Sequence, residues 1–220
     1  SLAPFRAARY TADGDALSAL LSPPYDVIDA AARDRLLALS PDNAVGLILP
    51  RDPQGSTDYA RAARMLDDQI ARGVLAVDDL PALYVYEIAD PSGTRTRGLL
   101  GAVELHAPED GVILPHEDVM AGPVADRLAL MEATEANLEP IYLIYDGNGD
   151  ASAIAAESTR GRPVSSTTTS DGIRHTVWAI RDPAALAGID ADLRTRTAVI
   201  ADGHHRYATY LELRSRRRAA

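Results

Sequence analysis

The sequence has 220 residues, of which 46% are apolar and 25% are charged, and its formal net charge is −10. This length allows one large domain or two small ones, and the negative charge disfavours binding to nucleic acid or to an anionic membrane surface. Every basic residue is arginine and cysteine is absent, which excludes chemistry that needs a lysine amine, a thiolate nucleophile, a thiolate zinc site or a disulfide.

Nothing in the sequence predicts a membrane segment. No apolar run approaches the ~20 residues that a membrane-spanning helix requires. The first residues also lack a charged segment followed by an apolar stretch of signal-peptide length. We therefore expect a cytoplasmic protein without a membrane or nucleic-acid partner.

The first half of the chain contains two helix patterns separated by an apolar run. Asp29 is expected to cap the first helix, and residues 44–49 predict a short strand. Ser56 or Thr57 is expected to cap the second helix, which ends at Gly73 in a left-handed conformation. The helical spacing in this second segment predicts a buried stripe formed by Tyr59, Ala63, Leu66 and Ile70.

Two β-hairpins are predicted from runs of β-branched, aromatic and aliphatic residues. The first joins residues 83–89 to residues 96–105 through an Asp-Pro-Ser-Gly turn. The second joins residues 164–170 to residues 173–180 through an Asp-Gly turn. A parallel sheet wound by helices on both faces would not contain two hairpins, so we expect an α+β fold with a mixed sheet.

The rest of the second half alternates between helices and strands. In chain order we expect a helix opened by Gly122 and Pro123, a strand after Pro140, a helix over 150–159, a helix from Asp182, a strand over 197–201 and a last helix from His204. We expect residues 1–220 to form a single domain. Because apolar Tyr207 and Leu211 in the last helix need a cover, we also expect the sequence to be the N-terminal part of a longer chain.

The strongest candidate site is the turn between the last predicted strand and the last predicted helix. Unpaired amides and the helix dipole favour an anion at such a turn. Gly203 permits close approach to the backbone, and Arg206 can pair with phosphate oxygens. His204 and His205 add further donors. The alternative is that Asp202 merely caps the helix while the histidines lie on its surface.

A second group of polar residues lies in and after the loop that precedes the Gly-Pro helix. His116 and Glu117 lie in the loop, and Asp126 and Arg127 lie near the start of the helix. The zinc-protease pattern is absent, because the fourth residue after His116 is Met120. Taken alone, Asp126 is typical of helix-dipole stabilisation and Arg127 of a solvated helix face.

A third group follows a pair of prolines near the N-terminus. Pro23 and Pro24 stiffen the backbone and present Tyr25 and Asp26 from a loop. A plain proline turn before a helix is an equally good interpretation.

Six segments resemble, in order, the landmarks of a bacterial and archaeal family, the domain of unknown function 1015 family. They are PFRAARY, PPYDVI, HEDVMAGPVADR, NLEPIYLIY, DGIRHTVW and ADGHHRYA. The segment DGHHRYA is also similar to the phosphate-binding box of the ParB/sulfiredoxin-like superfamily, which includes chromosome-partitioning nucleotidases, sulfiredoxins and free-serine kinases. Sulfiredoxin chemistry is excluded because the chain has no cysteine.

The second resemblance implies a nucleotide-dependent phosphotransferase that acts on a small hydroxyl compound such as serine, with ADP or ATP and Mg²⁺ as cofactors. We expect no dedicated metal site apart from Mg²⁺ bound with the nucleotide. The resemblance implies a catalytic set of Asp202, Glu117, His116 and Asp126, in which Asp202 or Glu117 holds Mg²⁺ or accepts the substrate proton. It implies that phosphate is bound by Gly203, His204, His205, Arg206 and Arg127. The loop with Tyr25 and Asp26 would contact the substrate.

Two other functions stay open on the residues alone. One is a module that senses a nucleotide or an anion without turnover. The other is a metal-dependent hydrolase that uses His116, Glu117, Asp202 and His204. Each needs only small-molecule partners, and the oligomeric state is not indicated. A shared site requires that the three groups of residues converge in space.

Overall fold

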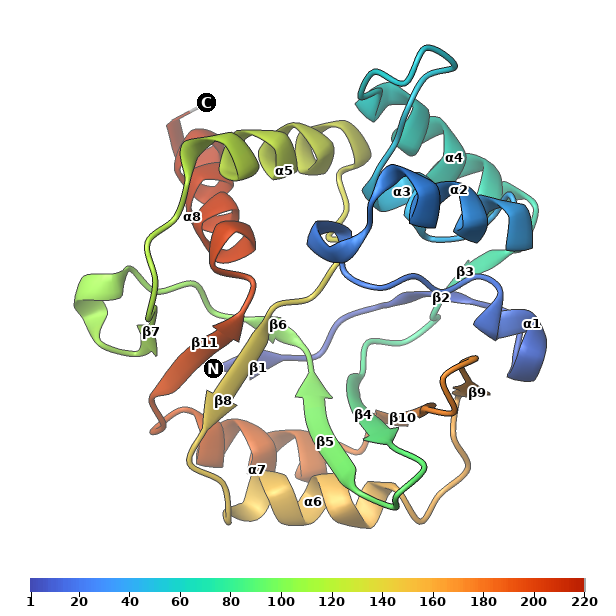
Figure 1. Ribbon diagram of the computed structural model, residues 1–220. Coiled ribbons are helices and arrows are strands. Elements are labelled where there is room, and N and C mark those ends of the chain that lie inside the picture. The colour runs from blue at the N-terminus through green and yellow to red at the C-terminus, as the bar shows by residue number, and fades with distance from the viewer. Residues whose placement is uncertain (220) are drawn as a thin grey trace.

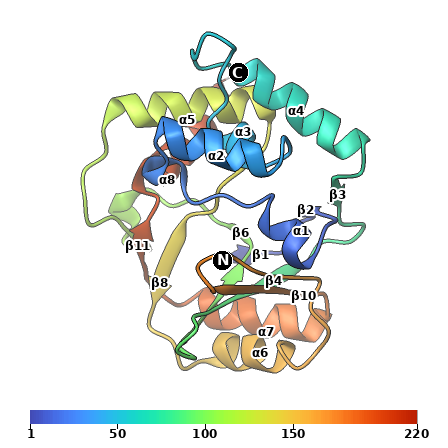
Figure 2. The same ribbon diagram turned by 45° about the vertical axis from the view of Figure 1, so that its right-hand side comes forward.

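The computed structural model describes residues 1–219, and in it two groups of helices enclose the strands (Figure 1). Helices α6 (Asp150–Ser158) and α7 (Pro183–Leu193) lie together on one side. The larger group on the other side consists of α2 (Ala30–Leu39), α3 (Val45–Ile48), α4 (Tyr59–Ala71), α5 (Ala121–Thr134) and α8 (His204–Ala219). The turned view in Figure 2 shows the same separation. The expected α+β class is confirmed.

A four-stranded antiparallel sheet lies beside α6 and α7. Its strand order is β5-β4-β10-β9, and both predicted hairpins lie within it. The strands are β4 (Leu83–Ala89), β5 (Arg95–Leu100), β9 (Ser165–Thr168) and β10 (Arg174–Ile180). Leu83, Val85 and Trp178 on one face pack against Ala151 of α6 and Ile189 of α7. The main apolar core of this half of the molecule therefore lies between the sheet and the two helices.

A three-stranded mixed sheet positions the candidate site. Strand β11 (Ala198–Asp202) lies between β7 (Ile113–Leu114), which is parallel to it, and β8 (Tyr142–Tyr145), which is antiparallel. Consequently the C-terminal ends of β7 and β11 and the N-terminal end of β8 all lie at one edge of this sheet.

The remaining elements are short. Two pairs of strands are antiparallel, β1 with β6 and β2 with β3. The bounds are β1 (Leu2–Ala3), β2 (Ala8–Tyr10), β3 (Leu75–Val77) and β6 (Ala102–Val103) for the strands, α1 (Gly14–Ser18) for a short helix, and η1 (Tyr25–Val27) and η2 (Pro108–Asp110) for two 3₁₀ turns. Among residues 1–219, no helix combines the length and apolar character needed to cross a bilayer.

The strand predicted over residues 44–49 is wrong, since this segment forms the helical turn α3. The side chain of Asn43 accepts a hydrogen bond from the amide of Val45, and its carbonyl accepts one from Gly46. A β-carbon added at Gly46 would lie 2.8 Å from the sulfur of Met65 in α4. Local capping and close packing on α4 therefore determine this conformation, although the apolar run alone resembles a buried strand.

Helix α4 is confirmed, but its cap and buried stripe differ from the prediction. The cap is Asp58, which accepts from the amide of Arg61, rather than Ser56 or Thr57. Ala62 and Gln69 are buried, whereas Ile70 is 40% exposed. The buried face is thus rotated by about one residue from the predicted one. The C-terminal end is as predicted, with Gly73 at a φ of +72°.

Tyr207 in α8 is covered by the chain itself. Its side chain is only 3% exposed and packs with Ile113 of β7 and Ile200 of β11. Its hydroxyl donates to the carbonyl of His106 and accepts from the amide of the same residue. We expected a further segment of the chain to cover this side chain. For Tyr207, β7 and β11 provide that cover instead.

Candidate functional site

The three groups of polar residues meet around the start of α8. The loop after β7 carries His116 and Glu117, and β11 turns through Gly203 directly into α8. Glu139, just before β8, accepts a hydrogen bond of 3.2 Å from the amide of Tyr25. Because β7 and β11 end where β8 begins, these segments share one sheet edge. The convergence that a shared site requires is therefore present.

Gly203 makes the turn from β11 into α8 possible. Its φ is +95°, a conformation that other residues rarely adopt. A β-carbon at this position would lie 2.9 Å from the Cγ2 atom of Ile141. The first helical bond runs from the amide of Tyr207 to the carbonyl of Gly203 at 2.8 Å. The earlier amides of α8 have no upstream helical carbonyl and point out of the first turn.

The two histidines of this turn hold the loop after β7. The buried ring of His204 accepts the amide N–H of His116 at Nε2 (3.3 Å), and its Nδ1 lies 3.0 Å from Oε1 of Glu117. His205 accepts the amide N–H of Met120 at Nε2 (3.1 Å). These contacts place the proton of a neutral His204 ring on Nδ1. Burial lowers the pKa of His204, although the charge of Glu117 opposes that effect.

The alternative in which both histidines lie on the helix surface therefore fails for His204, which is 4% exposed.

Arg206 connects β11, α8 and the segment before β8. It is 7% exposed, and its guanidinium donates to the carboxylate of Asp202 and to the carbonyl of Pro140. The Asp202 side chain is 53% exposed, so it can face a ligand while it is paired with Arg206. Arg206 thus fixes Asp202 at the sheet edge, in addition to any direct contact with an anion.

A second buried guanidinium lies on α5 beside the first. Arg127 donates to Asp126, to Glu139 at 3.3 Å and to the carbonyl of Ile48 at 2.9 Å. Its Cζ atom lies 4.2 Å from the centre of the Tyr25 ring, which is within range of a cation–π interaction. Arg127 therefore ties the N-terminal proline loop to the segment before β8, and the interpretation as a solvated helix residue is wrong.

Two functional candidates were not identified in the sequence. The side chain of Glu139 is only 12% exposed, and burial raises its pKa in spite of Arg206 and Arg127 nearby. The hydroxyl of Tyr59 in α4 donates to Asp126 at 2.7 Å. Burial, and to a smaller extent this hydrogen bond, raises the pKa of Tyr59 to about 12. The only sequence signal for Glu139 is its place in the segment NLEPIYLIY, where Pro140 suggested a strand start. Tyr59 was assigned to the apolar stripe of its helix.

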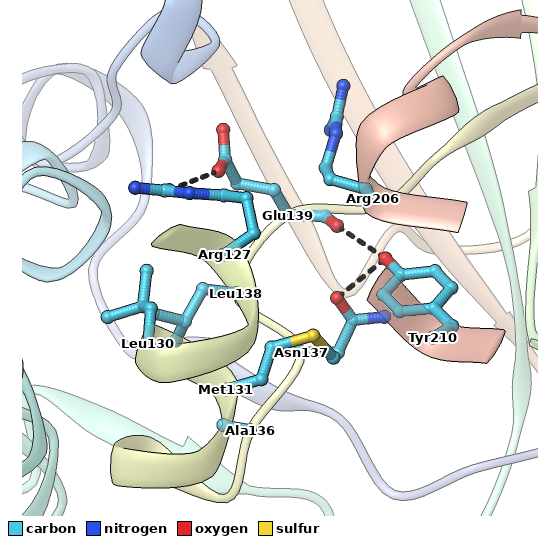
Figure 3. Close-up of a pocket in the computed structure, with 9 residues that line it drawn as sticks. All are labelled: Arg127, Leu130, Met131, Ala136, Asn137, Leu138, Glu139, Arg206 and Tyr210. Carbon is cyan, nitrogen blue, oxygen red and sulfur yellow. Dashed lines mark hydrogen bonds and ion pairs between the residues drawn. The ribbon is translucent and has the colours of Figure 1, made fainter. Parts of the chain in front are cut away.

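Figure 3 shows the residues that line a small cavity, among them Arg127, Glu139, Arg206 and Tyr210. The hydroxyl of Tyr210 lies between Asn137 and the carbonyl of Glu139. The cavity volume is about 20 Å³, room for about one water molecule. This cavity is therefore too small for a nucleotide.

Asp26 and His116 are exposed at the rim of the same region. The ring of His116 packs edge-on against that of His204, with 4.4 Å between the ring centres. His116, Glu117 and His204 together offer three atoms that can ligate a metal ion, all within 4.8 Å of one another. The site therefore joins imidazoles, carboxylates and two buried guanidiniums around one helix start.

The sequence pattern of one protein family, described as "Protein of unknown function (DUF1015)", matches residues 2–220. No curated protein and no solved structure gives a significant match to the chain.

Proposed function

The chain belongs to the DUF1015 family of proteins of unknown function, and we propose that it is a nucleotide-dependent phosphotransferase acting on a small hydroxyl compound. The observation that carries the proposal is the meeting of three distant segments at the first turn of α8. A glycine with a φ of +95° opens this helix, and its first residues are His204, His205 and Arg206. Phosphate groups bind at helix starts of this kind, where amides and the helix dipole face the anion.

The similarity of DGHHRYA to the ParB/sulfiredoxin-like phosphate-binding box supports the same assignment. It remains a proposal by analogy, as does the choice of serine as a substrate. Because function depends on the site and not on such a likeness, the charges and contacts of the site residues decide what the chain can do.

The charges at the site require a divalent cation for this reaction. Around the start of α8, the carboxylates of Glu117, Asp126, Glu139 and Asp202 outnumber the guanidiniums of Arg127 and Arg206, so a free polyphosphate would be repelled. Phosphoryl transfer proceeds by positioning and by neutralising charge, which Mg²⁺ provides when it is bound to phosphate oxygens. Asp202 and Glu117 are both more than half exposed and can supply oxygen ligands, which Mg²⁺ prefers. The donor set therefore fits Mg²⁺ carried in with ADP or ATP.

The remaining residues divide between binding and orientation. The amides of the first turn and His205 lie where phosphate oxygens would approach α8. Arg206 and Arg127 hold Asp202 and Asp126 in place, and Asp202 or Glu117 accepts the proton of the substrate hydroxyl. Tyr25, fixed over Arg127, presents the exposed carboxylate of Asp26 toward the small-molecule substrate. A cytoplasmic location, where nucleotides are abundant, is part of the proposal.

The test is a thermal-shift screen with ADP, ATP, CTP and pyrophosphate, each with and without Mg²⁺. A ligand present at a hundred times its Kd adds about 2.7 kcal/mol, which corresponds to roughly 5 to 10 °C for a chain of this size. We expect a nucleotide to give this shift only with Mg²⁺. Serine and other hydroxyl compounds are then assayed for nucleotide-dependent phosphorylation.

Two variants localise the binding. His205→Ala removes a side chain at the proposed phosphate site, whereas Arg216→Ala removes an exposed arginine farther along α8. We expect the nucleotide shift to disappear in the first and to persist in the second. A shift that both variants keep would place the nucleotide elsewhere. Binding without turnover would favour a sensing module over a phosphotransferase.

A further inference from the structure

We propose that the start of α8 and the loop after β7 bind one divalent transition-metal ion through His116, Glu117 and His204. Their three ligand atoms lie within 4.8 Å of one another. The site lies at the same sheet edge as the proposed phosphotransferase site. Metal binding, however, is argued from these three side chains alone and requires no nucleotide.

The spacing of two ligand atoms is close to that of a metal site. Nδ1 of His204 and Oε1 of Glu117 are 3.0 Å apart. Two ligands about 2.1 Å from one ion at the tetrahedral angle are separated by about 3.4 Å, so this pair has to open by only about 0.4 Å. His116 is exposed, and its ring packs edge-on against His204. Because this side chain is exposed, it has room to turn toward the other two ligand atoms, which are no more than 4.8 Å from its own.

The donor atoms select the class of ion. Two imidazole nitrogens and one carboxylate oxygen suit Zn²⁺, Fe²⁺, Co²⁺ or Mn²⁺, whereas Mg²⁺ and Ca²⁺ prefer sites made only of oxygen atoms. Three protein ligands also leave at least one coordination position open. That position would accept water or an oxygen of an anionic ligand.

Coordination by Nδ1 of His204 requires one rearrangement. Without a metal this nitrogen carries the ring proton and donates it toward Glu117, while Nε2 accepts the amide N–H of His116 at 3.3 Å. When Nδ1 binds an ion, its proton must leave or move to Nε2, and the His116 amide must then turn away. Both loop residues are exposed, so the loop can make this change. Metal binding should therefore shift the loop and release protons.

The competing interpretation is that Glu117 only orients His204. The experiment that separates the two uses untagged full-length protein treated with a chelator and titrated with Zn²⁺ by equilibrium dialysis. Co²⁺ is used in parallel because its visible absorption reports nitrogen and oxygen ligands. We expect one ion per chain in the absence of nucleotide.

Three variants test the ligand assignment. His116→Ala and Glu117→Gln change exposed side chains, so each should fold normally. Each should weaken Zn²⁺ binding by at least about 100-fold, because loss of an outer partner of a metal ligand alone costs about 10–100-fold. His106→Ala is the matched control: His106 lies 3.7 Å from Glu104 and 3.6 Å from Asp110, and its loss should leave binding unchanged. His204 is kept intact because its buried ring also holds the loop.

The inference is overturned if Zn²⁺ does not bind stoichiometrically, if both His116→Ala and Glu117→Gln bind normally, or if His106→Ala binds as weakly as they do. The result is independent of the nucleotide screen. Metal binding without any nucleotide binding would remove the phosphotransferase proposal and leave this one standing. Mg²⁺-dependent nucleotide binding without Zn²⁺ binding would overturn this inference and leave the phosphotransferase proposal standing.

Discussion

The substitution Gly203→Ala tests whether the turn into α8 needs a residue without a β-carbon because Ile141 and Arg206 lie close to the backbone, as well as because of the positive φ. At a φ of +95° an alanine is strained, which costs about 1–2 kcal/mol. Its β-carbon would also lie 2.9 Å from Ile141 and 3.2 Å from Nε of Arg206. Forcing a methyl group into a packed position costs about 1–3 kcal/mol. We therefore expect the free energy of unfolding to fall by about 2–5 kcal/mol.

Gly93 provides a matched control for the backbone strain. It has the same φ of +95°, in the exposed turn between β4 and β5, and a β-carbon there would have no neighbour within 4 Å. Gly93→Ala should therefore lose only the ~1–2 kcal/mol of strain. The difference between the two variants, about 1–3 kcal/mol, measures the close approach alone. Urea unfolding followed by circular dichroism gives both values.

Equal losses in the two alanine variants would refute this reasoning. That outcome would mean that Ile141 and Arg206 move aside freely and that the packing at the start of α8 is loose. A displaced Arg206 should also weaken nucleotide binding in Gly203→Ala, whereas Gly93→Ala should bind as the unchanged protein does.

Three further predictions concern stability. Tyr84→Phe should cost about 1.5–3 kcal/mol, because the buried Tyr84 hydroxyl donates to the carboxylate of Asp78, while Tyr142→Phe at a half-exposed position should cost little in the same urea titration. Burial alone would raise the pKa of Asp78, but hydrogen bonds from Arg9 and Tyr84 outweigh burial and hold the pKa below its ordinary value. The stability that this carboxylate contributes is complete above about pH 5 and is lost as the pH falls through its lowered pKa. In urea unfolding at a series of pH values from about 5 downward, the variant Asp78→Asn should not show this loss. Asp29→Ala removes a helix cap and should cost about 1 kcal/mol, or roughly 2–4 °C in a thermal melt.

The sequence predicted those elements whose signals are local. The Asp-Gly turn between β9 and β10 and the Asp182 cap of α7 depend on a few neighbouring residues, and both form as expected. Residues 44–49 show the limit of such signals, because packing of Gly46 on Met65 determines the helical turn. The buried stripe of α4 was misplaced for a related reason, since helix spacing alone does not say which face meets α5.

The candidate site was predictable only in part. Asp202, Gly203 and the residues that follow them were found because their positions are consecutive in one turn. Glu139 was missed because a single glutamate before a proline carries no signal, and its role depends on Tyr25, more than a hundred positions earlier in the chain. The buried state of Arg127 was likewise hidden, since Tyr25, Ile48 and Glu139, which contact it, come from three different segments.

The way the loop after β7 is held has a consequence for protein engineering. Two amide groups of the loop, at His116 and Met120, donate to imidazole rings on α8. An amide is present whatever the side chain, so the path of the loop between these two anchors does not depend on the identity of Asp118 or Val119, which are exposed. These two positions can be randomised in a library to alter ligand preference while the scaffold beneath them keeps its shape.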